Sequence, residues 1–245
     1  MGWIAEAVKP IGLSWVSDLL TSSIGRKLLM SLSGLFLILF LPVHLLGNLQ
    51  LLTEDGGKSF NVYAYFMTHN PLIKTISYLL YFSILLHTIQ GLLLWQQNRK
   101  ARGHKGYAVK ALRGAGTQVQ AASNMAWLGI IIFVFLAVHL YQFWLQMKLG
   151  RLPMVAIDGI DYKDLYTPVM FAFQDVRFVG FYVSSMVIIG IHLHHGFQSS
   201  FQTLGLQHRK YTPLIRFLGT AYSLSIPLGF AIIPVVVYGR SKAWW

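Results

Sequence analysis

The chain contains no cysteine and few charged residues. Without thiols it offers no disulfide, no thiolate zinc site, no iron–sulfur ligand and no C-x-x-C-H haem attachment. Charged residues are 11% of the 245 residues, against about 25% in ordinary soluble domains. This shortfall excludes a disordered chain and an ordinary cytosolic enzyme. Acids are scarcest, with 8 Asp and Glu against 20 Lys and Arg, and on an apolar chain this basic excess favours loops beside anionic lipid over nucleic-acid binding.

Five stretches without Lys, Arg, Asp or Glu are long enough to cross a bilayer, which takes roughly 20 apolar residues. None of them alternates as a transmembrane β-strand would. We therefore predict an all-α membrane protein with one domain at residues 25–240, after a leader at 1–24 and before a tail at 241–245. The predicted spans are Leu28–Leu52, Thr75–Trp95, Met125–Met147, Phe178–Gly205 and Phe217–Tyr238.

The uneven distribution of basic residues predicts the orientation. Of the 20 Lys and Arg, 12 lie on the side of the N-terminus, and the other 8 share their side with 6 acids. By the positive-inside rule we expect a cytoplasmic N-terminus and an external C-terminus. The leader lacks the pattern of a cleavable signal and is expected to be either a plain cytoplasmic segment or an interfacial helix. Residues 150–175 are expected to form an external loop with a short helix at Tyr166–Phe173.

Histidines recur at matched positions in the first four spans. In the first and third spans a histidine follows a glycine after nine intervening residues, in the pairs Gly34/His44 and Gly129/His139. In the second and fourth spans a histidine precedes a glycine by four positions, in the pairs His87/Gly91 and His192/Gly196. The first four spans thus form two similar hairpins, each with two histidines in apolar helices, where ionisable groups are costly and usually functional.

Depth in the membrane groups the same histidines. His44 and His139 lie ten and nine residues from the nearest outer flanking charge, or roughly 14–15 Å along a helix. His87 lies 13 residues from Lys74, and His192 lies 15 residues from Arg177, which is roughly 20–22 Å along a helix. The sequence therefore predicts an outer pair, His44 and His139, and an inner pair, His87 and His192.

Two buried imidazoles facing each other indicate a metal centre. Neutral imidazole binds iron, copper or zinc, but two imidazoles leave a zinc or copper site incomplete, and the spans contain no Cys, Asp or Glu to complete it. Haem supplies four more nitrogens and is buried among apolar side chains. We predict that the outer pair and the inner pair each hold one haem iron axially. A proton relay and helix–helix hydrogen bonding are the alternatives.

Other residues beside the histidines are predicted to serve the same sites. On a helix, His195 lies near the face of His192 and either contacts a haem propionate or packs as a polar group, whereas His194 points toward another helix or the headgroups. Three glycines lie on or near the ligand faces and would let a macrocycle approach the backbone: Gly47, Gly91 and Gly196.

With these motifs the chain resembles the di-haem cytochrome b subunit of succinate:quinone oxidoreductases, most closely the single-polypeptide anchor of bacterial succinate dehydrogenases and fumarate reductases. The likeness covers roughly residues 25–238. It is specific at Pro-Val-His-Leu-Leu-Gly-Asn (42–48), Leu-His-Thr-Ile-Gln-Gly (86–91), Val-His-Leu-Tyr (138–141) and His192-x-x-x-Gly196 with Gly205.

The resemblance implies a subunit of a respiratory enzyme in the bacterial cytoplasmic membrane. It implies two b haems, a membrane quinone, often menaquinone, and two partners on the cytoplasmic face, a flavoprotein with FAD and an iron–sulfur protein. Dicarboxylate chemistry belongs to the flavoprotein. The alternatives are a haem b subunit of a hydrogenase, formate dehydrogenase or nitrate reductase, and a histidine-based transporter or proton relay.

A quinone site is implied near the outer ends of the first two spans. Glu54 and Asp55 are the nearest acidic candidates, and Asn48 is a polar candidate in the same region. For the two acids the alternative is a solvated turn, Glu-Asp-Gly-Gly.

Overall fold

The computed structural model describes residues 15, 22–103 and 118–244. Within these ranges five helices are long and apolar enough to cross a membrane, which confirms the predicted all-α membrane fold. They are α3 (Ser23–Leu49), which continues as the 3₁₀ turn η2 (Gln50–Leu52), α5 (Pro71–Arg102), α6 (Gln118–His139), α9 (Val176–Thr203) and α10 (Thr212–Ser241). The leader, expected to be either a plain segment or an interfacial helix, falls almost wholly outside the described residues.

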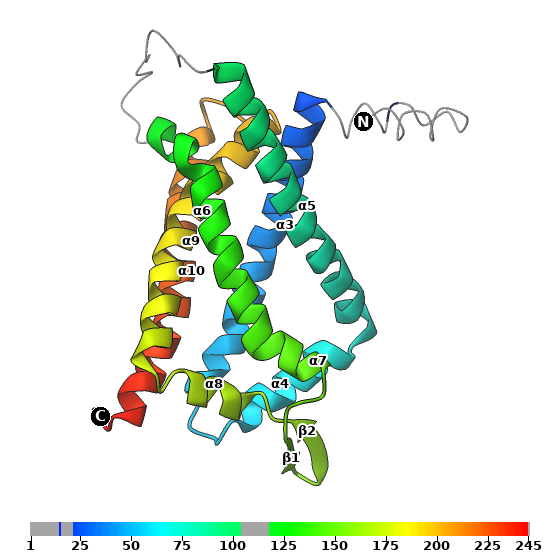
Figure 1. The fold of residues 1–245 in the computed structure, drawn as a ribbon, viewed down its shortest axis with the longest axis vertical. Helices are drawn as coiled ribbons and strands as arrows, with labels where there is room; N and C mark the ends of the chain where they lie inside the picture. The colour runs from blue at the N-terminus through cyan, green and yellow to red at the C-terminus, as the bar shows by residue number, and fades with distance from the viewer. Residues whose placement is uncertain (1–14, 16–21, 104–117, 245) are drawn as a thin grey trace.

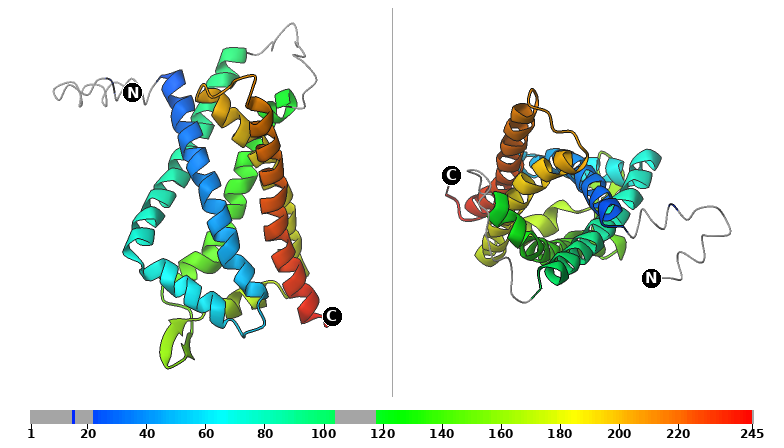
Figure 2. Two further views of the ribbon diagram at one scale, coloured as in Figure 1. Left: turned by 180° about the vertical axis from the view of Figure 1, so that it is seen from behind. Right: turned by 90° about the horizontal axis from the view of Figure 1, so that it is seen from above.

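The five helices form an antiparallel bundle, and we call its two ends the N-terminal face and the C-terminal face (Figures 1 and 2). At the N-terminal face α3, α6 and α10 begin, and at the C-terminal face α3 and α10 end. In the bundle α9 packs against α10, α6 and α3, and α3 packs against α5 and α10. Toward the C-terminal face α3 and α5 diverge, and α4 (Lys58–His69) bridges them (Figure 1).

A proline inside α3 creates a specific contact between α3 and α10. Pro42 has no N–H to donate to the carbonyl oxygen of Ile38. The hydroxyl of Tyr222 in α10 donates a hydrogen bond to that oxygen instead. Because an unpaired backbone carbonyl is costly in lipid, this contact stabilises the stretch of α3 just before His44.

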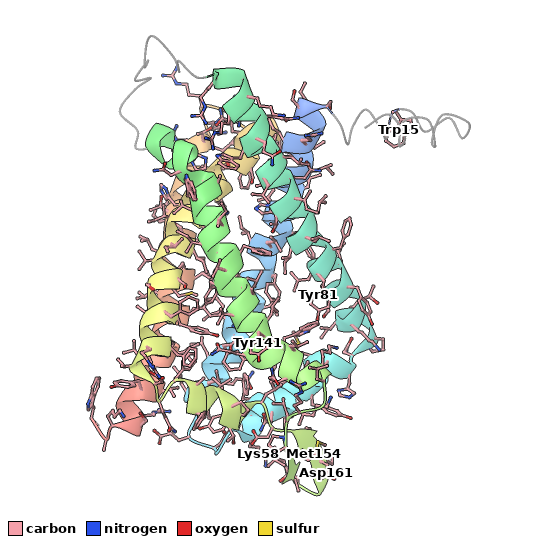
Figure 3. The ribbon with its side chains drawn as sticks, viewed as in Figure 1. Trp15, Lys58, Tyr81, Tyr141, Met154 and Asp161 are labelled. Atoms are coloured by element: carbon pink, nitrogen blue, oxygen red, sulfur yellow. The ribbon has the colours of Figure 1, made fainter. Side chains whose placement is uncertain are left out.

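The C-terminal face is covered by short elements. They are α4, a hairpin of β1 (Met154–Ile157) and β2 (Ile160–Lys163), and α8 (Tyr166–Ala172), and Figure 3 shows Lys58, Met154 and Asp161 at this end. The helix predicted near Tyr166 is confirmed, whereas α4 and the hairpin were not predicted. The hairpin turns at Asp158 and Gly159, both with positive φ (51° and 79°), as a two-residue type I′ turn requires.

One buried asparagine connects these covering elements. The side-chain oxygen of Asn61 in α4 accepts hydrogen bonds from the backbone N–H groups of Leu165 (3.0 Å) and Tyr166 (3.1 Å). Its amide nitrogen donates to the carboxylate of Asp164 at 3.1 Å. These bonds hold the start of α8 against α4, so the C-terminal face is ordered around the outer ends of the spans.

Candidate functional site

The structure brings the four span histidines together in two pairs. The ring centres of His44 and His139 lie 5.9 Å apart with planes at 81°, and those of His87 and His192 lie 6.3 Å apart at 69°. These are the pairs that the repeat and the depths predict. The outer pair lies near the ends of α3 and α6 at the C-terminal face, and the inner pair lies deep in α5 and α9.

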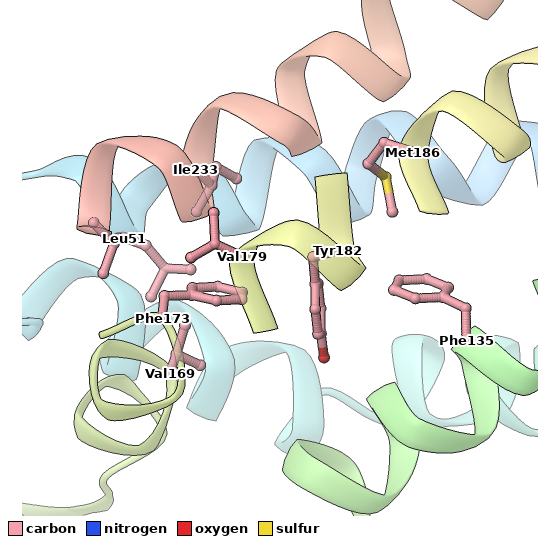
Figure 4. Packing of buried hydrophobic residues seen from close by; sticks show 9 residues of the cluster. Leu51, Phe135, Val169, Phe173, Val179, Tyr182, Met186 and Ile233 are labelled. Atoms are coloured by element: carbon pink, nitrogen blue, oxygen red, sulfur yellow. The ribbon is translucent and has the colours of Figure 1, made fainter. Parts of the chain in front are cut away.

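Aromatic side chains enclose the outer pair. The ring of His44 stacks on Phe40 at 5.0 Å and lies 5.5 Å from Phe230. The ring of His139 stacks on Phe135 at 5.8 Å and lies 6.1 Å from Tyr182. Figure 4 shows Tyr182 in the buried cluster with Phe135, which fixes this wall of the site.

Hydrogen bonds orient the outer imidazoles. The hydroxyl of Tyr182 donates to the side-chain oxygen of Gln142 at 2.7 Å, and its oxygen lies 3.5 Å from Nδ1 of His139. The Tyr182 oxygen can therefore accept a hydrogen bond from Nδ1–H of His139, which leaves Nε2 free to bind a metal. Nδ1 of His44 lies 3.3 Å from the amide nitrogen of Asn48, which also donates to the His44 carbonyl oxygen at 2.7 Å.

A π-helical segment directly follows His139. It spans Leu140–Leu145 and precedes the short helix α7 (Gln146–Lys148). Such segments are rare and occur frequently at functional sites. Within it, the indole N–H of Trp144 donates to the hydroxyl of Tyr81 at 2.8 Å, which links the end of the third span to α5.

The inner pair has sparser surroundings. Nδ1 of His87 lies 3.3 Å from the hydroxyl of Ser33, which donates to the Leu29 carbonyl and can accept the Nδ1 proton. Nδ1 of His192 is buried and has no hydrogen-bond partner among the described residues. Among the described residues, the rings of His87 and His192 make aromatic contact only with each other. A Cβ at Gly34 would lie 3.0 Å from Cε1 of His87, so this glycine makes room for the imidazole.

The four imidazoles suit axial ligation of a planar cofactor. Two imidazoles bound on opposite sides of one metal ion at about 2 Å have ring centres roughly 6 Å apart, which matches both pairs. Each of the four imidazoles packs against a histidine of another helix. All four histidines are nevertheless only half-buried. No group of three or more His, Asp or Glu in the described ranges could hold a bare metal ion. Among the described residues, each pair thus presents two imidazoles and no third protein ligand.

The predicted glycines have different neighbours. A Cβ at Gly196 would meet nothing within 4 Å, and one at Gly91 would meet only Met30, at 3.3 Å. A Cβ at Gly47 would lie 2.4 Å from the ring of Tyr63 in α4. In this structure Gly47 makes room for the ring of Tyr63, which comes from the unpredicted helix α4 on that side of α3.

The quinone-site candidates from the sequence have structural partners. Glu54 forms an ion pair with Arg240 at 3.2 Å. The carboxylate of Asp55 accepts hydrogen bonds from the backbone N–H groups of Ser59 (2.8 Å) and Gly57 (3.0 Å) at the start of α4. Hydrogen bonds from the side chain and the backbone of Ser59, with a smaller one from the Gly57 backbone, hold the pKa of Asp55 below its usual value. These contacts favour the turn interpretation of both acids. Asn48 lies against His44, as described above.

The remaining span histidines differ in their contacts. Nε2 of His194 lies 3.3 Å from the side chains of Gln198 and of Thr220 in α10, so His194 faces another helix. His195 is half-buried on the N-terminal side of the inner pair. Sequence reasoning missed Tyr182 and Gln142, because their link to His139 depends on how two helices face each other.

Comparisons of the chain with protein families, curated proteins and solved structures find no match.

Proposed function

We propose that the chain is the membrane-anchor and electron-transfer subunit of a succinate:quinone oxidoreductase, either a succinate dehydrogenase or a fumarate reductase. The carrying observation is the pair of facing histidines at each of two depths, with ring centres 5.9 and 6.3 Å apart. Both distances are typical of two axial ligands of one iron. Two such centres along the bundle axis suit electron transfer between the two faces.

The histidines would hold two b haems, which when bound supply one-electron redox centres inside the membrane. His44 and His139 would bind the outer iron, and His87 and His192 the inner one. Tyr182 and Ser33 would accept hydrogen bonds from the Nδ1–H groups of His139 and His87, which would leave Nε2 of each imidazole available to hold a haem iron. The aromatic side chains around the outer pair exclude water and lower the local dielectric.

The faces of the bundle would have different partners. The N-terminal face carries the basic ends of α5 and α10, including Arg99, Lys100 and Arg216. In the proposed orientation it is cytoplasmic and receives the iron–sulfur and flavoprotein subunits, which hold the clusters and FAD. Membrane quinone, in many such enzymes menaquinone, would exchange electrons with the outer haem.

Anaerobic reduction of the purified complex tests the proposal. With its co-purifying subunits, the chain should show a b-type spectrum that succinate reduces and fumarate reoxidises. Reduction by hydrogen or formate instead would assign the chain to one of the other respiratory complexes. A purified chain without haem absorbance would contradict the proposal.

A further inference from the structure

A cavity at the C-terminal face lies next to the outer histidine pair, because its lining includes Gln142 and also Phe143, whose ring centre is 5.6 Å from that of His139. Its volume is about 650 Å³, within the usual range of ligand pockets. It lies between the π-helical segment, α8, the start of α9 and the end of α10. Its apolar walls include Phe143, Phe171 and Phe178, and its charged members are Asp175, Arg177 and Lys242.

Two of the charged members lie where membrane spans end. Arg177 is the second residue of α9, and Lys242 directly follows the last residue of α10. Because these helices are long enough to cross the bilayer, both cations lie near the boundary between hydrocarbon and headgroups. The cavity therefore combines an apolar wall with a basic rim at the depth of lipid phosphates.

Among the described residues, the rim carries one positive charge that no carboxylate pairs with. Arg177 pairs with Asp175 at 2.6 Å, so these two charges offset each other. The ammonium of Lys242 lies 5.3 Å from the centre of the Tyr238 ring, and the ion pairs of the described residues leave it without a carboxylate. An uncharged acceptor can take hydrogen bonds from the remaining N–H groups of Arg177 but leaves the charge of Lys242 unpaired, whereas a single anion accepts hydrogen bonds and also offsets that charge.

We propose that this cavity binds one anionic phospholipid. Its phosphodiester contacts Arg177 and Lys242, and its glycerol and proximal acyl carbons pack on Phe171 and Phe178. The net charge of the rim matches one phosphodiester. The inference rests on the membrane spans and the cavity, and it does not depend on haem or on succinate chemistry.

Native mass spectrometry of the purified chain with phosphatidylglycerol tests the proposal. The double variant Arg177→Gln/Lys242→Gln should weaken binding of this lipid roughly tenfold or more, since each basic side chain near a membrane surface contributes about 1 kcal/mol. The matched control is Lys148→Gln/Arg151→Gln, which removes two exposed cations from the same face and should leave binding unchanged. Lys242→Gln alone should weaken lipid binding severalfold. Because Lys242 directly follows the last residue of α10, this single change leaves every helix intact.

Three further arms identify the ligand. Phosphatidylcholine should bind the unaltered chain more weakly than phosphatidylglycerol, and inorganic phosphate at the same concentration should not displace the lipid. Equal binding of phosphatidylglycerol by the double variant and the control would overturn the proposal. Loss of a co-purified neutral quinone from the double variant, with phosphatidylglycerol retained, would also overturn it and would assign the cavity to quinone.

Discussion

The outer and inner histidine pairs come from the same sequence repeat but differ in their surroundings. Phe40, Phe230, Phe135 and Tyr182 surround the outer rings. The inner pair has one serine contact, and Nδ1 of His192 has no hydrogen-bond partner among the described residues. The repeat therefore determines where the ligands lie, and the side chains between them determine how rigidly each ligand is held. We expect the inner site to depend more on its bound group for order.

Removing a ligand should have the largest effect. His139→Ala and His192→Ala should each halve the haem-to-protein ratio, by loss of the outer and the inner haem respectively, because each change removes one of the two axial bonds that would hold that haem. The inner variant should also lose more thermal stability. His69→Ala, at the end of α4, is the control and should retain both haems. Full haem content in both span variants would refute the ligand assignment.

The contact between Tyr222 and Ile38 should matter next. Tyr222→Phe leaves the Ile38 carbonyl without a donor and should cost about 0.5–2 kcal/mol, as interhelical hydrogen bonds in membranes do. Detergent-induced unfolding measures this cost, and Tyr211→Phe in the preceding loop is the control. In the Pro42→Ala background residue 42 regains its N–H, so the same change should cost much less. If Tyr222→Phe costs as much stability in the Pro42→Ala background as in the unaltered chain, Tyr222 does not act by replacing the missing N–H of residue 42.

The two repeat glycines provide a smaller and more specific contrast. Gly34→Ala places a Cβ 3.0 Å from the His87 ring, whereas Gly129→Ala meets nothing within 4 Å. Gly34→Ala should weaken the inner haem roughly tenfold, since disturbed support of a ligand costs 10–100-fold, and leave the outer haem unchanged. Separate redox titration of the two haems shows this. An equal effect of both substitutions would mean that Gly34 does not position His87.

Acid should weaken the elements that cover the C-terminal face through Asp164. Burial alone raises the pKa of Asp164, but hydrogen bonds from Thr167 and Asn61 outweigh it and place the pKa below its usual value. The stabilisation is therefore complete above the unfolded pKa of about 4 and is lost as pH falls below it. Hydrogen exchange of α4 and α8, corrected for intrinsic rates, should rise in this acid range. Asp164→Asn should flatten the dependence, and Asp161→Asn, at an exposed position, should preserve it.

The sequence predicts the five spans and the pairing of the histidines because hydropathy and helical spacing are local signals. The hairpin also had a local signal, Asp158-Gly159, which the sequence analysis did not use. The role of Gly47 was not predictable, because Tyr63 reaches it from α4. Tyr182, which supports His139, was missed for a similar reason, since a hydrogen bond between two helices depends on their relative rotation.

A pyridine haemochrome assay on the purified chain, combined with protein quantification, tests the central claim most directly. The account predicts two haems of type b per chain, and one in each single-ligand variant. A chain that is folded and membrane-inserted but carries no haem would contradict it.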